Sequence, residues 1–143
     1  WGCIRRENPT ELRAIAATWR RGYRSRLRVM TSKDLSDSQW MTLCVVTTTV
    51  AHAAEADDLA RALVAAKAAA CVQTESITSY YEWDGVLKAS PEWRLVCKTL
   101  PDVLPRLTEL LRSKHSYEVP QINMRTERCL QDYAQWLKQQ VQV

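Results

Sequence analysis

The sequence contains no phenylalanine and only three glycines and two histidines among its 143 residues. With so few glycines, we expect no glycine-rich loop of the kind that cradles phosphate groups, and the GxGxxG, P-loop and GxSxG motifs are absent from the chain. No pair of candidate catalytic carboxylates stands out either. The sequence therefore gives no positive indication of catalysis, and we predict that the protein is not an enzyme.

Long hydrophobic runs are also missing. No apolar stretch reaches the roughly 18 residues that cross a bilayer. Charges or amides interrupt each one, including the alanine-rich stretch from Leu59 to Cys71. The apolar fraction of 46% and the charged fraction of 25% are typical of a globular chain, and the length suits a single domain. We therefore predict one folded domain that does not associate with a membrane.

The sequence also lacks closely spaced cysteines. The five cysteines stand at positions 3, 44, 71, 97 and 129, and no CxxC pair occurs. Tetrahedral zinc sites generally use at least one close pair, and small secreted domains use a denser, even-numbered set for disulfides. We therefore expect reduced thiols in an intracellular protein, with Cys44, Cys71 and Cys97 as small residues of the hydrophobic core.

Positive charge is concentrated at one end of the chain. The formal net charge is +4, but residues 1–29 carry eight arginines and two glutamates, whereas residues 30–143 have a net charge of −2. A nucleic-acid interface needs basic groups on a folded face of the domain. Because the basic excess lies in residues 1–29, which we call the leader, we expect no nucleic-acid partner.

The sequence leaves three interpretations of the leader open. Asn8 as N-cap, Pro9 at the first helical position and Glu11 at the third would begin one short helix in an otherwise disordered segment. An arginine-rich, acid-poor segment is also typical of an organelle transit peptide, which would carry an otherwise cytoplasmic protein into an organelle. In the third interpretation, Met30 is the natural start and the leader is an upstream addition.

Residues 30–40 are polar and turn-forming and predict a linker, so that the folded domain covers residues 41–143. Within this domain, β-branched runs predict strands, and apolar residues spaced by three and four predict helices. The predicted elements are, in order, strand 43–49, helix 53–69, strand 71–83, strand 86–99, helix 102–114, strand 119–126 and helix 130–140. Asp84 and Gly85 predict a tight hairpin turn, and Pro91 predicts a bulge or a local edge.

The start of the second helix follows from the position of Pro105. If Thr99 were the N-cap, Pro105 would stand inside the helix and cost about 3 kcal/mol. With Asp102 as the N-cap, Pro105 falls in the first turn, where no intrahelical N–H is lost. We therefore place the N-cap at Asp102. The order β-α-β-β-α-β with an extra C-terminal helix predicts a ferredoxin-like α+β fold, an antiparallel sheet with two helices on one face.

Several segments of this domain, taken in order, resemble the CutA divalent-cation-tolerance proteins. The matching segments are DLARALV at 58–64, AAC at 69–71, TSYYEWDG at 78–85, Glu92, Lys98 with Thr99, HSYEVP at 115–120 and DYxxWL at 132–137. Together they span about residues 42–138, and the ordered set is specific. The resemblance implies a small, very stable, intracellular homotrimer of ferredoxin-like subunits, in which long hairpin strands pair between neighbours.

The resemblance also implies ligand-binding clefts at the subunit interfaces. The residues that would line such a cleft in this chain are Trp83, Glu92, Lys98, Tyr117 and Glu118. On a strand of period two, Glu92 and Lys98 point to the same face, where they would hold an anion or form an inter-subunit ion pair. The aromatic residues of the TSYYEW segment are expected at a subunit interface rather than in a base-stacking platform, because no basic groove accompanies them.

Metal ligands proposed for some members of this family are a cysteine in the first strand, a histidine of the HPY segment and a glutamate that closes the EVPE segment. The resemblance places Thr48, His115 and Gln121 at these three positions. Threonine and glutamine are poor ligands for soft or borderline metals. We therefore predict at most a weak site for copper or another divalent cation, with His115 as the remaining donor. The alternative for His115 is a loop histidine at a helix C-terminus, and His52 is expected to be an ordinary surface residue.

The function implied by the resemblance is that of a CutA-like homotrimer in divalent metal ion tolerance or homeostasis, with copper as the main candidate. It would bind small ligands or ions in the inter-subunit clefts without catalysis. The alternative is a PII-like signalling trimer that binds a nucleotide or another small anion, since such regulators share this architecture. The altered metal ligands favour the alternative, whereas the missing glycine-rich phosphate loop disfavours it.

Overall fold

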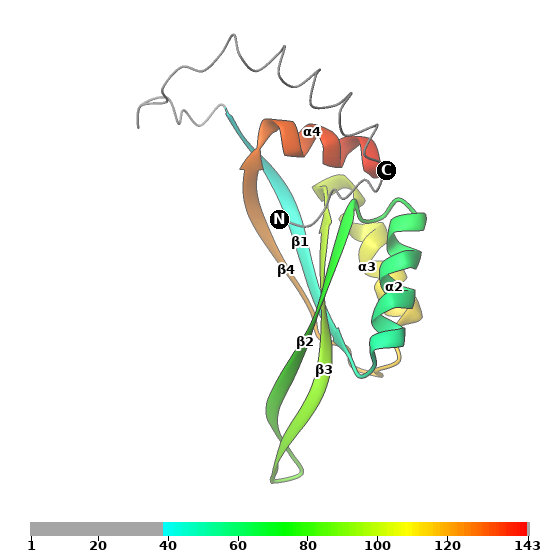
Figure 1. The fold of residues 1–143 in the computed structure, drawn as a ribbon, viewed down its shortest axis with the longest axis vertical. Helices are drawn as coiled ribbons and strands as arrows, with labels where there is room; N and C mark the ends of the chain where they lie inside the picture. Colours follow the sequence, from blue (N-terminus) through cyan, green and yellow to red (C-terminus); the bar gives the residue numbers. More distant parts are fainter. Residues whose placement is uncertain (1–38, 143) are drawn as a thin grey trace, which may run out of the picture. The chain divides into compact units, whose positions relative to one another are not determined.

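This computed structural model describes residues 39–142, which form a four-stranded sheet with helices packed against it (Figure 1). In chain order the elements are β1 (Trp40–Val50), α2 (Ala53–Ala65), β2 (Cys71–Trp83), β3 (Val86–Thr99), the 3₁₀ helix η2 (Pro101–Val103), α3 (Leu104–Lys114), β4 (Ile122–Leu130) and α4 (Gln131–Gln140). The leader and the first residues of the predicted linker, up to residue 38, lie outside the described residues.

The strands run antiparallel in the order β2-β3-β1-β4. Helix α2 joins β1 to β2, helix α3 joins β3 to β4, and both pack on the same face of the sheet (Figure 1). This topology confirms the predicted ferredoxin-like α+β fold with an extra C-terminal helix. The edges of the sheet are β2 and β4, so each has one side without a strand partner within residues 39–142.

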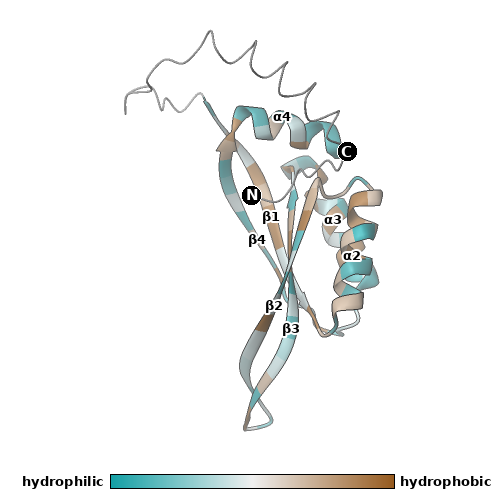
Figure 2. Ribbon diagram, in the orientation of Figure 1, coloured by the Kyte–Doolittle hydropathy of each residue, from teal (hydrophilic) through white to brown (hydrophobic). Residues whose placement is uncertain are grey.

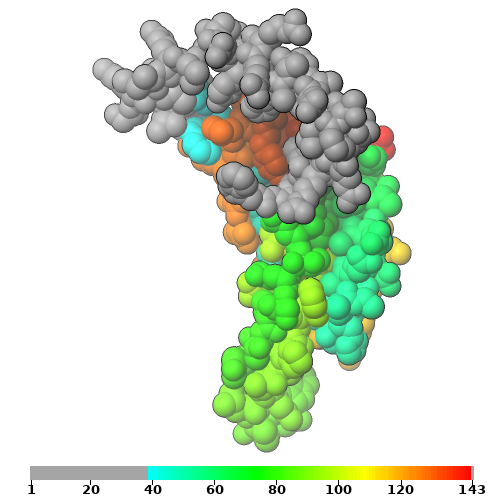
Figure 3. Space-filling view, viewed as in Figure 1, coloured from blue at the N-terminus to red at the C-terminus, as the bar shows by residue number. Residues whose placement is uncertain are grey.

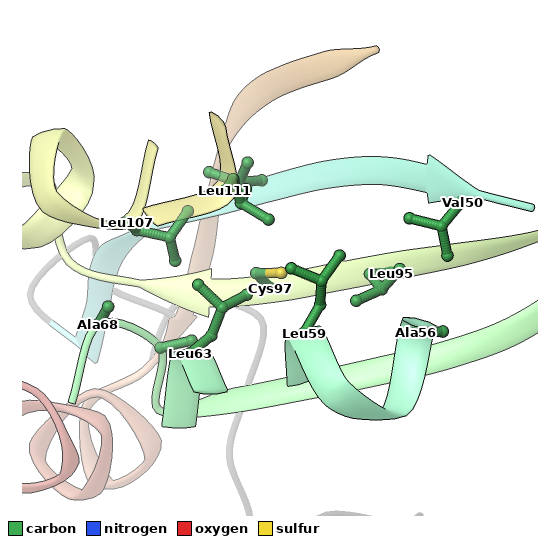
Figure 4. Close-up of a cluster of buried hydrophobic side chains, with 11 residues drawn as sticks. Val50, Ala56, Leu59, Leu63, Ala68, Leu95, Cys97, Leu107 and Leu111 are labelled. Carbon is green, nitrogen blue, oxygen red and sulfur yellow. The ribbon is translucent and has the colours of Figure 1, made fainter. Parts of the chain in front are cut away.

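The main core lies between the sheet and helices α2 and α3 (Figure 4). Val46 of β1 pairs with Cys97 of β3, and both side chains point toward the helices. Leucines of the two helices cover them: Leu59, Leu63, Leu107 and Leu111, each at most 3% exposed. Burial of one such leucine stabilises the fold by about 1.5–3 kcal/mol, so this face carries most of the packing energy.

A second, smaller core lies on the opposite face of the sheet, beneath α4. Alternate residues of a strand point to opposite faces, so Leu43 and Val45 point away from the main core and pack against Leu137 of α4. Helix α4 covers only one end of this face (Figure 1). Figure 2 shows β1, which is buried from both sides, as more hydrophobic than the edge strand β4.

Strands β2 and β3 form a long hairpin that extends beyond the helices (Figures 1 and 3). At its turn, Asp84 and Gly85 have positive φ values of 51° and 73°, as a two-residue type I′ turn requires. Trp83 stands opposite Val86, and the pairing continues without a bulge to the other end of β2. The predicted turn and the predicted bounds of both strands are confirmed.

Pro91 stands opposite Thr78 in the hairpin. The pairing of β3 with β1 ends at Trp93, so no third strand faces the position where Pro91 lacks an N–H. Pro91 therefore lies at a local edge of the sheet, which is one of the two alternatives that the sequence allowed.

Helix α2 ends at Ala65, whereas the sequence predicted an end at residue 69. Lys67 follows with a positive φ of 57°. Its N–H donates to the Val64 carbonyl, and the N–H of Ala68 donates to the Leu63 carbonyl, both at 3.0 Å. These two bonds form a Schellman motif, which closes the helix. The prediction was too long because alanines on both sides of Lys67 favour a helix and no glycine marks the stop.

Helix α3 begins slightly later than predicted. Its N-cap is Val103 rather than Asp102, although Pro105 falls in the first turn as expected. The N–H groups of Val103 and Leu104 both donate to the Leu100 carbonyl, at 3.0 and 3.1 Å. A 3₁₀ turn therefore precedes the helix and takes up the predicted cap residue.

The strands β1 and β4 also depart from prediction. Strand β1 begins at Trp40, the last residue of the predicted linker, and pairs with β4 from Trp40 opposite Leu130 to Thr48 opposite Ile122. Strand β4 covers Ile122–Leu130 instead of 119–126. Most of its side chains are exposed, so β4 lacks the hydrophobic run by which the other strands were found. Helix α4 begins one residue later than predicted, and its end agrees.

Cys44, Cys97 and Cys129 are free thiols. Cys44, Cys71 and Cys97 are buried, as predicted, and Cys129 is half-buried. Burial raises the pKa of the Cys97 thiol to about 12, which makes it an unreactive core residue. No helix in this part of the chain is both long and apolar enough to cross a membrane.

Candidate functional site

A cavity of about 720 Å³ lies along the β2–β3 hairpin. Its walls come from β1, from the hairpin and from the segment between α3 and β4, which we call the 115–121 loop. The lining residues are Thr49, Ser79, Tyr80, Tyr81, Trp83, Lys88, Glu92, Tyr117, Val119 and Gln121. Trp83, Glu92 and Tyr117, three of the predicted cleft residues, are thus brought together by the fold.

The Glu92 carboxylate accepts two hydrogen bonds in this cavity. The Tyr117 hydroxyl donates to Oε1 at 2.8 Å, and the Ser79 hydroxyl donates to Oε2 at 2.5 Å. Both donors are neutral, so the negative charge of Glu92 is oriented but not cancelled. A half-buried carboxylate held in this way can accept a further hydrogen bond from a ligand or pair with a cation.

Tyr117 remains protonated at physiological pH. Burial, together with the hydrogen bond to Glu92 and its negative charge, raises the pKa of Tyr117 to about 12. The phenol is therefore a hydrogen-bond donor and neither a base nor a nucleophile. The chemistry of this pair is that of binding rather than of proton abstraction.

His115 follows the last residue of α3 and bonds to β1. Its Nε2 lies 3.0 Å from Oγ1 of Thr48, which is fully buried, and its Nδ1 accepts the N–H of Tyr117 at 3.1 Å. The fold therefore brings together Thr48 and His115, two of the three positions at which the resemblance implied metal ligands. Both ring nitrogens of His115 are engaged with the protein.

The third of these positions, Gln121, lines the cavity, and its side chain is exposed. Within the described residues, no three His, Cys, Asp or Glu side chains come close enough together to hold a metal ion. A threonine hydroxyl and a glutamine amide are weak ligands for copper(II). The residues at these positions therefore do not suit a tight copper site.

Two other predicted cleft residues lie away from the cavity in this chain. Lys98 is six residues from Glu92 along β3, about 20 Å at the usual rise of a strand. Its ammonium group lies 5.8 Å from the centroid of the Tyr133 ring of α4, in a cation–π contact. Glu118 is exposed on the 115–121 loop and does not line the cavity. His52 is exposed just before α2, as predicted.

Three cavity residues were not predicted from the sequence: Ser79, Thr49 and Lys88. The role of Ser79 follows from the hairpin register, because Ser79 stands opposite Ser90 and is therefore a diagonal neighbour of Glu92 on one face. Counting the residue pairs of the hairpin outward from the Asp84-Gly85 turn would have predicted that Ser79 lies beside Glu92. Thr49 and Lys88 carry no comparable signal in the sequence.

A family model described as CutA1 divalent ion tolerance protein matches residues 44–140. The chain is 40% identical over 86 residues to human Protein CutA, a match covering 59% of this chain and 48% of the human protein. It therefore spans about half the length of this relative. It is also 31% identical over 100 residues to the divalent-cation tolerance protein CutA of Thermotoga maritima, covering 69% of this chain and 99% of that protein.

Solved structures show the same likeness. The structure of CutA from Synechococcus elongatus PCC7942 matches with a TM-score of 0.70 at 32% sequence identity, covering 73% of this chain and 97% of that one. The residues matched by the family model include those that line the cavity. The chain belongs to the CutA1 divalent ion tolerance protein family.

Proposed function

We propose that this protein acts in tolerance to divalent metal ions, copper among them, by binding small ligands or ions rather than by catalysis. The observation that carries the proposal is the match of residues 44–140 to the CutA1 family. The cavity supports binding, because its carboxylate is oriented by two neutral hydroxyls and Tyr117 is a donor with a raised pKa. The PII-like alternative is not favoured, since the family that matches is the CutA1 family.

A ligand in the cavity would contact a hydrogen-bond acceptor and aromatic side chains. Glu92 offers its carboxylate, while Tyr81 and Trp83 contribute rings to the lining. An organic cation or a small molecule with a hydrogen-bond donor suits such a site. Lys88 adds a positive charge in the same lining, so a ligand that also carries an acceptor would be held at two points.

We propose a homotrimer as the functional assembly. The outer half of the hairpin exposes large apolar side chains, with Tyr80, Trp83 and Leu87 exposed by 72%, 65% and 74%. Apolar groups on a long projecting strand pair favour burial against another subunit. A neighbouring subunit would then also close the cavity, because the cavity lies along this hairpin. Light scattering should give the mass of a trimer at micromolar concentration, and a monomer would contradict the proposal.

We also propose that the protein resides inside the cell. The buried Cys44 and Cys97 are free thiols, which suits a reducing compartment. If the leader is a transit peptide, it directs the protein to an organelle. Microscopy of the full chain with a C-terminal fluorescent tag, with and without residues 1–29, distinguishes the two locations.

Complementation of copper sensitivity tests the main proposal. The chain is expressed in a bacterial strain that lacks its own CutA protein and grows poorly at raised copper. We expect the full chain to restore growth and the Glu92→Gln variant to restore it less, because the variant removes the negative charge from the cavity. Arg61→Gln, on the exposed face of α2, is the matched control and should behave as the unmodified chain.

Growth of the same cultures also shows the outcomes that would contradict the proposal. If the chain is present as a folded trimer in the cells and growth at raised copper stays as poor as without it, the tolerance function is wrong. If Glu92→Gln restores growth as well as the unmodified chain does, the tolerance function stands and the cavity is not its site.

A further inference from the structure

The His115 imidazole bonds to the protein through both ring nitrogens. Nδ1 lies 3.1 Å from the backbone nitrogen of Tyr117, and Nε2 lies 3.0 Å from Oγ1 of Thr48. A backbone N–H can only donate, so Nδ1 is the unprotonated nitrogen of the ring. In the neutral imidazole the proton is then on Nε2, which donates to the Thr48 oxygen.

We propose that His115 is a positioning residue and not a metal ligand: its imidazole bridges β1 and the 115–121 loop and thereby holds Tyr117 at Glu92. A metal ion binds a histidine through the lone pair of an unprotonated ring nitrogen. Here the lone pair of Nδ1 accepts the Tyr117 N–H, and Nε2 carries a proton. A divalent cation would have to break one of these bonds, with only the weak donors of Thr48 and Gln121 at the matched positions in return.

The His115 bridge holds Tyr117, the residue that orients the Glu92 carboxylate in the cavity. The N–H of Tyr117 is held by His115, and the hydroxyl of the same tyrosine donates to Glu92. The two rings also contact, with centroids 5.2 Å apart. Next along the loop, the N–H of Ser116 donates to Oε1 of Glu55 in α2 at 3.2 Å. The loop is therefore held by β1, α2 and β3 together, and His115 supplies the hold on β1.

Loss of the bridge has a defined consequence. Without an acceptor at the position of Nδ1, the Tyr117 N–H loses its partner, and the side chain of Tyr117 is free to leave Glu92. Only the importance of this bridge for ligand binding rests on the proposed function. Its tautomer and its hydrogen bonds are measurable in the ligand-free protein, so failure of the copper-tolerance experiment would leave this inference standing.

Nitrogen-15 NMR of the imidazole rings tests the tautomer. The chain has two histidines, and the His52→Gln variant assigns the remaining imidazole signals to His115. At about pH 8, we expect a protonated Nε2 and an unprotonated Nδ1. These signals should not move when zinc ion alone is added in excess. The opposite tautomer, or a shift of the His115 signals to those of a zinc-bound ring, would overturn the proposal.

Amide hydrogen exchange at Tyr117 tests the positioning role. The oxygen of an asparagine side chain can replace Nδ1 as an acceptor for the N–H two residues on, whereas the glutamine side chain reaches toward the position of Nε2. We expect His115→Asn to keep the Tyr117 amide protected. His115→Gln and His115→Ala should speed its exchange about tenfold or more, as the loss of one hydrogen bond allows. Equal protection in all three variants would overturn the proposal.

A second variant covers the case in which His115→Ala does not fold. Thr48→Val keeps the shape of the buried side chain and removes the acceptor of the Nε2 proton. We expect it to stay folded, judged by unchanged exchange in α2, and to speed the exchange of the Tyr117 amide several-fold. A Thr48→Val protein with the protection and the imidazole signals of the unmodified chain would show that the bridge does not hold the loop.

Discussion

Tyr117 donates its hydroxyl to Oε1 of Glu92 across 2.8 Å, although the two residues are 25 positions apart in the chain. The bond joins the 115–121 loop to β3, and Ser79 binds the other carboxylate oxygen from β2. A single carboxylate on β3 thus links the 115–121 loop to the β2–β3 hairpin. The cavity and the stability of this region therefore depend on the same contacts.

Replacing Tyr117 with phenylalanine should lower the free energy of unfolding by about 1 kcal/mol. The change removes one hydrogen bond to a charged acceptor, and the partial exposure of the pair limits its value. Urea denaturation measures the loss. Tyr80→Phe is the control, because Tyr80 is 72% exposed, and it should change the free energy little. Equal effects of the two substitutions would contradict the importance of the Glu92 contact.

The unfolding free energy should fall as the pH rises from about 10 to 12. Tyr117 has a pKa of about 12 in the folded protein and an ordinary value near 10 in the unfolded chain. Between these values the folded protein binds more protons, so its stabilisation is complete below about pH 10 and is lost above it. The Tyr117→Phe variant should lose less stability over this range. Denaturation at both ends of the range gives the difference, and parallel losses in the two proteins would show that another group is responsible.

The hairpin was predictable from the sequence because its signals are local. The Asp84-Gly85 turn fixes the register, and the register places Ser79 beside Glu92. The edge strand β4 was not predictable to the same extent, since its exposed residues have no hydrophobic pattern and its pairing with β1 is non-local. The end of α2 was missed for a related reason, because its stop is a backbone conformation at Lys67 without a glycine.

The candidate site was predictable only in part. The resemblance placed Thr48 and His115 at positions of proposed metal ligands, and the fold brings the two side chains into hydrogen-bond contact. The face shared by Glu92 and Lys98 follows from strand periodicity, but periodicity carries no information on distance along β3. The contact of Lys98 with Tyr133 depends on where α4 packs, which the sequence alone did not specify.

Replacing Lys67 with glycine should stabilise the fold by about 0.5–1 kcal/mol. Lys67 has a φ of 57°, a left-handed conformation that costs a residue with a Cβ atom more than it costs glycine. The Schellman hydrogen bonds around it are made by backbone groups and remain. Thermal denaturation should show a higher Tm. Ala66→Gly is the control at a right-handed position and should lower the Tm. A lower Tm for both variants would refute the strain at Lys67.

Polar substitutions on the outer hairpin should dissociate the proposed trimer. Trp83→Ser together with Leu87→Ser removes two large exposed side chains that are expected to be buried between subunits. Light scattering should then show a lower mass, and circular dichroism should show that the subunit stays folded. Val64→Ser, at an exposed apolar position on α2, should leave the mass unchanged. A trimer that persists in the double variant would place the subunit interface elsewhere.

Copper(II) should bind the unmodified protein at most weakly and not through His115, since both ring nitrogens of His115 bond to the protein. Neither a thiolate nor a carboxylate is present at the Thr48 and Gln121 positions. Restoring both, as Thr48→Cys with Gln121→Glu, should tighten binding about tenfold or more, or about 1.4 kcal/mol. Oγ1 of Thr48 lies 3.0 Å from Nε2 of His115, so a cysteine thiolate at position 48 would lie beside the imidazole. Because the thiol must lose a proton to bind the metal, the gain should increase with pH. On the imidazole the proton only moves from Nε2 to Nδ1, which breaks the bond from the Tyr117 N–H.

Calorimetric titration with copper(II) at neutral pH measures these affinities. Thr48→Ser with Gln121→Glu is the matched control, because it adds the carboxylate but no thiolate, and its gain should be smaller than that of the cysteine variant. A submicromolar site in the unmodified protein that survives His115→Ala would show that other residues hold the metal. A tight site that is lost in His115→Ala would instead show that copper displaces the bonds to Thr48 and Tyr117, and the bridging role of His115 would then fail together with this prediction.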